Sequence, residues 1–120
     1  MDFRKYRGKI LAAVSDVREK DTMWGWHVKR INKDKILIRW GYLDYVGQKG
    51  DFSIRALEDC GDMSLVGCMD DRYGDEWFRD DDADDLFCWV GDKHWHDAAN
   101  VEDGIWELVH RMAYLAHARY

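Results

Sequence analysis

The chain has 120 residues, of which 47% are apolar and 14% are aromatic, and its net charge at pH 7 is −6. This length predicts a single globular domain over residues 1–120, and the apolar content excludes a chain too polar to fold. The acidic balance disfavours a general binder of DNA or of anionic membranes, because such proteins carry a basic surface.

The cysteines and the hydropathy pattern indicate a cellular compartment. Cys60, Cys68 and Cys88 are an odd number without close pairing, which favours reduced thiols in a cytosol over a disulfide framework. No apolar run follows Met1, so we expect no secretion signal. No run reaches the roughly 18 apolar residues of a membrane span. We therefore expect a cytoplasmic protein without membrane contact.

Residues 3–19 have the periodicity of an amphipathic helix that Asp2 can cap. Its apolar positions recur at steps of three and four and comprise Phe3, Tyr6, Ile10, Ala13, Val14 and Val17. The basic residues Arg4, Lys5, Arg7 and Lys9 fall on or beside the opposite face. This basic cluster is either a solvated helix face or a docking patch for an acidic partner, including the chain's own acidic stretch.

Residues 22–57 predict three antiparallel strands with tight connections. Trp24, Trp26 and Val28 alternate with polar or small residues, and Asn32–Lys35 is a polar turn. Residues 36–46 form the longest apolar run; a strand that is apolar on both faces belongs in the interior of a sheet, and this two-sidedness allows a dimer through the sheet. Gly47–Gly50 predicts a second turn before a third strand over residues 52–56.

Residues 63–69 can form a fourth strand, and Leu86–Val90 is a buried run of strand length. Residues 101–119 predict a second helix, capped by Asn100 with Asp103 completing a capping box. Its inward stripe comprises Val101, Ile105, Leu108, Val109, Met112, Leu115 and Ala116. A second stripe, which is either the flank of a wide buried face or a contact surface, consists of Trp106, His110, Tyr114 and His117. The fold class is α+β, an antiparallel sheet of three to five strands packed with an N-terminal and a C-terminal amphipathic helix.

The stretch Asp70–Asp85 holds nine carboxylates and two arginines, with Tyr73, Trp77 and Phe78 among them. Carboxylates this dense cannot be buried, because each unpaired buried charge is costly. The charge along the chain is uneven: residues 1–57 carry 13 Lys and Arg against seven Asp and Glu, whereas residues 58–104 carry three against 16. The chain therefore combines a basic first half with an acidic surface segment.

Motifs for metal or catalytic chemistry are weak. Asp80, Asp82 and Asp84 start like an EF-hand loop, but its sixth and twelfth positions would be Asp85 and Gly91 instead of glycine and glutamate. Cys88, His94 and His96 could ligate a transition metal with Cys60 or Cys68, although a buried structural thiol is the simpler interpretation. The chain has no nucleophile elbow, zinc-protease motif or phosphate loop, so we expect neither an enzyme nor a cofactor.

Trp24, Trp26 and Trp40 raise an alternative, a stacking platform for single-stranded nucleic acid. The basic residues close to them in sequence are Lys29, Arg30, Lys33, Lys35 and Arg39. Aromatic residues at alternating strand positions are more often core, and the whole chain is acidic, so we expect no direct nucleic-acid contact.

Dense carboxylates with interleaved aromatic rings resemble a nucleic-acid strand in two features, regular negative charge and rings that can stack. We therefore expect a non-enzymatic inhibitor that blocks a basic protein partner that handles nucleic acid. The expected partner-binding residues are Asp70, Asp71, Asp75, Glu76, Trp77, Phe78, Asp80, Asp81, Asp82, Asp84 and Asp85. In composition alone the chain resembles small acidic inhibitors of phages and mobile elements, such as anti-CRISPR and anti-restriction proteins. An immunity-type protein that neutralises a basic toxin, and a merely solubilising acidic loop, remain alternatives.

Overall fold

The computed structural model describes residues 2–43, 45–59, 62–71, 86–90 and 98–119. A short 3-10 helix η1 (Phe3–Tyr6) leads into α1 (Arg7–Lys20). Five strands follow, β1 (Trp24–Ile31), β2 (Lys35–Tyr42), β3 (Tyr45–Asp59), β4 (Asp62–Asp71) and β5 (Leu86–Val90), and α2 (Ala98–Arg119) ends the chain. The strands pair antiparallel in the order β1-β2-β3-β4-β5. The predicted α+β class, with one sheet and two terminal helices, is confirmed.

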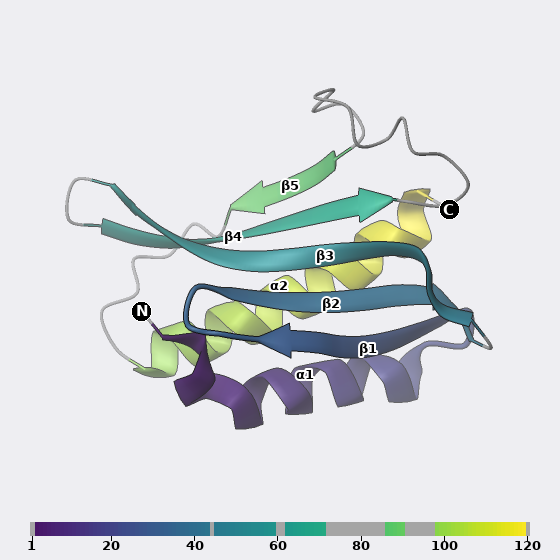
Figure 1. Ribbon diagram of the computed structural model, residues 1–120, viewed down its shortest axis with the longest axis horizontal. Coiled ribbons are helices and arrows are strands. Elements are labelled where there is room, and N and C mark those ends of the chain that lie inside the picture. Colours follow the sequence, from purple (N-terminus) through teal and green to yellow (C-terminus); the bar gives the residue numbers. More distant parts are fainter. Residues whose placement is uncertain (1, 44, 60–61, 72–85, 91–97, 120) are drawn as a thin grey trace.

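The helices share one face of the sheet. Figure 1 shows α2 crossing behind the strands, while α1 lies along β1. Side chains alternate in β2, so that Ile36, Ile38 and Trp40 are buried while Lys35, Leu37 and Arg39 are partly exposed on the outer face. The predicted helix stripes supply the other half of the core, with Ile10, Ala13, Val14 and Val17 from α1 and Val101, Ile105, Leu108, Val109, Met112 and Ala116 from α2.

The start of the chain is tied to the sheet as well as capped. The carboxylate of Asp2 accepts a hydrogen bond from the backbone N–H of Arg4 at 3.0 Å, which confirms the predicted cap. Phe3 is fully buried, and its N–H donates to the carbonyl of Lys33 at 3.2 Å. This bond holds η1 against the β1–β2 turn.

The predicted turn at Gly47–Gly50 is wrong. The chain reverses after Tyr42, which lies opposite Tyr45, and β3 runs through the two glycines. Gly50 lies opposite the buried Trp40 in the register, where a residue without a side chain leaves room for a large indole. The apolar run 36–46 is therefore not one strand but parts of two.

The predicted cap of the second helix is also wrong. α2 begins at Ala98, so Asn100 lies inside it. Its apolar stripe fixes the packed face, but the burial of that face does not specify where the first turn starts. Neither helix in the described part of the chain has a stretch apolar and long enough to span a bilayer.

Candidate functional site

The acidic stretch reaches the sheet at one end. Asp70 and Asp71 are the last residues of β4; Asp70 lies between Asp51 and Leu86 in the register, and Asp71 lies opposite Gly50. Because β4 and β5 are adjacent and antiparallel, the end of β4 at Asp71 and the start of β5 at Leu86 lie at the same end of the sheet. The other predicted binding residues, Asp75, Glu76, Trp77, Phe78, Asp80, Asp81, Asp82, Asp84 and Asp85, lie outside the described residues.

We call this end of the sheet the hairpin end, because the β2–β3 reversal lies there. It carries three exposed apolar residues, Met23, Tyr42 and Leu43, which are 41%, 41% and 54% exposed. Trp24 pairs with Tyr42, and Met23 directly precedes β1 while Leu43 directly follows β2. Exposed apolar side chains that gather in one place are typical of protein-binding surfaces. Sequence analysis missed them, because apolar alternation predicts burial.

Three buried tryptophans support this surface from within. Trp24, Trp26 and Trp40 are at most 2% exposed. The ring of Trp40 meets that of Trp24 edge-on at 5.1 Å and stacks on that of Trp26 at 5.8 Å, and Trp24 lies 5.0 Å from the ring of Tyr42. The alternative of a stacking platform for nucleic acid is therefore wrong, since these rings are core and no base can reach their faces.

Asp21 fixes the loop that leads into the hairpin end. One of its oxygens accepts from the N–H groups of Met23 and Trp24, at 2.9 and 2.8 Å. The other lies 2.6 Å from the indole nitrogen of Trp26 and 2.9 Å from Nε2 of His117. Burial raises the pKa of this carboxyl, but the hydrogen bonds outweigh burial and leave it below its ordinary value. Asp21 thus orders Met23 and joins β1 to α2.

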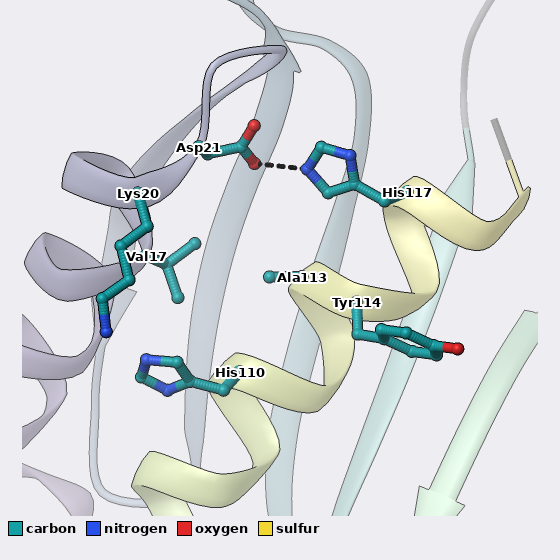
Figure 2. A pocket seen from close by; sticks show the side chains of 7 residues that line it. All are labelled: Val17, Lys20, Asp21, His110, Ala113, Tyr114 and His117. Atoms are coloured by element: carbon teal, nitrogen blue, oxygen red, sulfur yellow. Dashed lines mark hydrogen bonds and ion pairs between the residues drawn. The ribbon is translucent and has the colours of Figure 1, made fainter.

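His110 lies about two turns before His117 on α2 and lines the same groove between α1 and α2 (Figure 2). Nε2 of His110 is 2.7 Å from Asp16, and its Nδ1 is 2.8 Å from the carbonyl of Trp106. Both partners are acceptors, so only the doubly protonated ring donates to both. Lys20 also binds Asp16, at 2.8 Å. Hydrogen bonds from Lys20 and then His110 lower the pKa of Asp16.

The groove is therefore a junction between helices. It has a volume of about 170 Å³ and is lined by Val17, Lys20, Asp21, His110, Ala113, Tyr114 and His117. The charged groups that line it are already engaged with one another or with Asp16. The second stripe of α2 accordingly divides: His110 and His117 bind α1 and the Asp21 that follows it, whereas Tyr114 is 68% exposed.

The suggested metal ligands cannot be assembled from the described residues. Cys60, His94 and His96 lie outside them, and within the described ranges no three His, Cys, Asp or Glu side chains form a metal site. Cys68 and Cys88 lie directly opposite each other on β4 and β5, a proximity that sequence spacing did not reveal. The side chain of Cys68 is partly exposed.

Comparison of the chain with protein-family models, curated proteins and solved structures finds no match.

Proposed function

We propose that the protein is a cytoplasmic, non-enzymatic inhibitor that binds a basic, nucleic-acid-handling protein through the hairpin end, in the manner of phage or mobile-element inhibitors. The observation that carries this proposal is that exposed apolar residues and the start of the acidic stretch lie at the same end of the sheet. Met23, Tyr42 and Leu43 are exposed at the end of the sheet where β4 ends at Asp71 and β5 begins at Leu86.

The combination matches the anatomy of a protein interface. A few apolar or aromatic side chains supply most of the binding energy, and polar groups surround them. Dense carboxylates attract a basic partner over a distance and raise the association rate at low salt. Tyr42, Leu43 and Met23 would serve as anchors, and Asp70 to Asp85 as the charged surround. Trp77 and Phe78 are proposed as further anchors.

A rigid base favours this role. Binding is weakened when flexible side chains must be ordered on association. Asp21 fixes the backbone at Met23 and Trp24 through hydrogen bonds, and the buried Trp24 lies against the ring of Tyr42. Contacts within the chain therefore hold the backbone of Met23 and the ring of Tyr42 in place.

Capture from a host lysate, read by mass spectrometry at low and high salt, tests the proposal. Conversion of five acidic residues to asparagine, Asp80, Asp81, Asp82, Asp84 and Asp85, should reduce capture steeply at low salt, because steering depends on charge. Leu43→Ser should reduce capture at both salt concentrations. Leu11→Ser is the matched control, since Leu11 is 42% exposed but lies on α1 away from the hairpin end.

Capture that is the same for wild type, the asparagine variant and Leu43→Ser would reject the proposal. The identity of the captured protein separates the two inhibitor classes. A host enzyme or complex acting on nucleic acid supports an anti-restriction or anti-CRISPR type. A co-encoded basic toxin supports the immunity type instead.

A further inference from the structure

Basic side chains gather at the opposite end of the sheet, which we call the basic end. The bond from Phe3 to Lys33 brings η1 and the start of α1 beside the β1–β2 turn. This places together cations that are far apart in the sequence, namely Arg4, Lys5, Arg7, Lys29, Arg30, Lys33, Lys35 and Arg55. All of them are exposed except Lys35, which is partly buried. Arg4, Lys5 and Arg7 of the predicted basic patch thus lie at the same end of the sheet as the strand cations, whereas Lys9 lies 5.0 Å from the ring of Trp106.

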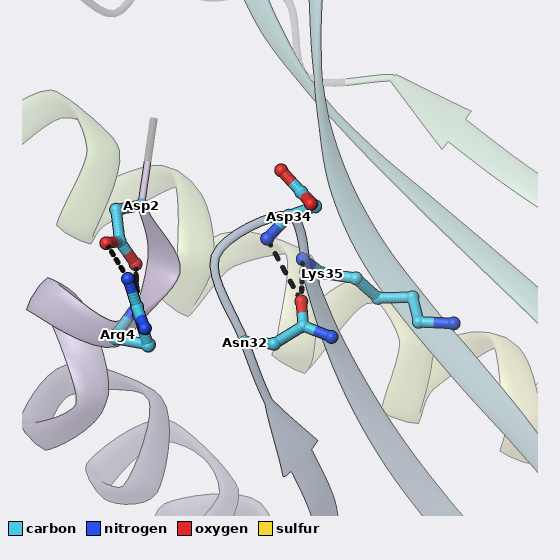
Figure 3. A network of polar contacts seen from close by, with 5 residues as sticks. All are labelled: Asp2, Arg4, Asn32, Asp34 and Lys35. Atoms are coloured by element: carbon cyan, nitrogen blue, oxygen red, sulfur yellow. Dashed lines mark hydrogen bonds and ion pairs between the residues drawn. The ribbon is translucent and has the colours of Figure 1, made fainter.

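The carboxylates at the basic end include Asp2 and Asp34, and the charge of Asp34 acts on Arg4. Asp2 binds its own neighbour Arg4, at 2.7 Å, and this hydrogen bond is the main reason that its pKa falls to about 2. Figure 3 shows this pair beside the turn, where Asn32 accepts from the N–H groups of Asp34 and Lys35. Glu58, Asp59 and Asp62 belong to the β3–β4 hairpin, which extends beyond the β1–β2 turn in Figure 1.

Two cations on the outer face oppose each other directly. Lys35 of β2 lies opposite Arg55 of β3, and Arg30 of β1 lies opposite Leu37, the next outward position on β2. Like charges at opposed positions destabilise a sheet. Arg30, Lys35 and Arg55 form no ion pair within the described part of the chain, whereas Arg39 in the neighbouring row binds Asp51 at 2.9 Å. A surface that concentrates cations at this cost suits an anionic ligand.

The absence of apolar anchors points to the kind of anion. The exposed large apolar residues of the described structure are Leu11, Met23, Tyr42, Leu43 and Tyr114, and none lies among the cations of the basic end. A protein partner would need such anchors, and a single strand would need rings on which bases stack. A duplex needs neither, because it presents closely spaced phosphates on its outside.

We propose that the basic end binds the phosphate backbone of duplex nucleic acid without reading its sequence. This revises the expectation that the chain makes no direct nucleic-acid contact, which followed from its total charge. The negative charge is concentrated in residues 58–104, whereas the cations come from residues 4–55. The inference does not depend on the hairpin end.

Fluorescence anisotropy with a labelled 20-base-pair DNA duplex of mixed sequence tests this inference on the full chain. We expect a dissociation constant on the order of micromolar at 50 mM salt, which weakens as salt rises. Arg30→Gln/Arg55→Gln should weaken binding by about tenfold or more and flatten the slope of log K against log salt by about 2. The matched control is Lys20→Gln/Arg111→Gln, which removes the same charge from exposed positions away from the basic end. Circular dichroism would verify the fold of both variants.

Each outcome decides the question. Selective loss in Arg30→Gln/Arg55→Gln supports the inference. No binding at 50 mM salt, equal loss in both variants, or tighter binding of the corresponding single strand would overturn it. A labelled poly-aspartate peptide that binds more tightly than the duplex would assign the surface to an acidic protein instead.

Discussion

At the scale of single residues, Asp21 joins the loop before β1, β1 itself and α2 through its hydrogen bonds, and no sequence pattern indicates this role. Its side chain is only 3% exposed and accepts from two backbone N–H groups, one indole and one histidine. Asp21→Ala leaves the buried donors without partners and should lower the free energy of unfolding by about 2–3 kcal/mol. Urea denaturation measures this change. A loss below about 0.5 kcal/mol would show that water replaces the carboxylate at little cost.

Asp21 and two other carboxylates make the stability of the fold depend on pH. The pKa values of Asp2, Asp16 and Asp21 lie below their ordinary values in the folded chain. A group with a depressed folded pKa stabilises fully above its unfolded pKa of about 3.9, and this contribution is lost as pH falls through the folded pKa. The urea midpoint of wild type should therefore fall between about pH 4 and pH 2, and Asp21→Asn should fall less over this range. Parallel curves for the two proteins would contradict the assignment to Asp21.

Gly67 packs closely against two side chains of α2. A Cβ there would lie 2.8 Å from Cε of Met112 and 3.3 Å from Cδ2 of Leu108. Gly67→Val should cost about 2–3 kcal/mol of unfolding free energy, and Gly67→Ala less, since the end of Met112 is flexible. In a double-mutant cycle read by urea denaturation, Met112→Ala should cost less when combined with Gly67→Val than alone. Strictly additive costs would contradict the contact.

Gly8 provides the contrasting case. Nothing lies within 4 Å of a Cβ built on it in α1, so Gly8→Ala should stabilise the chain by up to about 1 kcal/mol through backbone entropy. Thermal denaturation of the two alanine variants should shift in opposite directions. A destabilised Gly8→Ala would contradict this account of the first helical turn.

At the scale of elements, η1 contributes to the core through one side chain, that of Phe3. Phe3 is fully buried in the common core although it lies at the start of the chain. Phe3→Ala should cost about 3–5 kcal/mol, measured by urea denaturation, whereas Leu11→Ala on the exposed face of α1 should change stability by about 0.5 kcal/mol or less. Similar costs for the two variants would mean that η1 is not part of the core.

Element type could be predicted from the sequence, but several boundaries could not. The stripes of Ile10 to Val17 and of Val101 to Ala116 specify helices because only one face is apolar, and the structure buries those positions. Gly47 and Gly50 led to the wrong prediction of a turn, because glycine occurs both in turns and in strands opposite a large cross-strand indole. Gly50 pairs with Trp40, ten residues away in the sequence, and a local pattern does not contain that pairing.

At the scale of the whole molecule, charge and apolar exposure separate along the sheet. The composition predicts an acidic surface at Asp70 to Asp85, but the exposed partners Met23, Tyr42 and Leu43 become visible only when the register brings β1 and the β2–β3 reversal together. Likewise, the basic end joins cations from η1, β1, β2 and β3. Both proposed surfaces are defined by residues that strand pairing brings close together, and the sequence alone does not show this pairing.

The two surfaces should be independent, because mutations at distant sites without shared partners act additively. Leu43→Ser should leave duplex affinity unchanged, and Arg30→Gln/Arg55→Gln should leave protein capture unchanged. Anisotropy and lysate capture on the same set of variants measure both. Loss of both activities from one variant would indicate a single shared surface or a damaged fold.

The strand order has a consequence for synthesis. Each strand pairs with its successor, so the hairpins can form one after another as the chain leaves the ribosome. The apolar face of the sheet then stays uncovered until α2 is made, because α2 is translated after all five strands. This face includes Ile36, Ile38, Phe52 and Ile54. A nascent chain stalled before residue 98 would present that bare face to chaperones or to other stalled copies, and should be prone to aggregation.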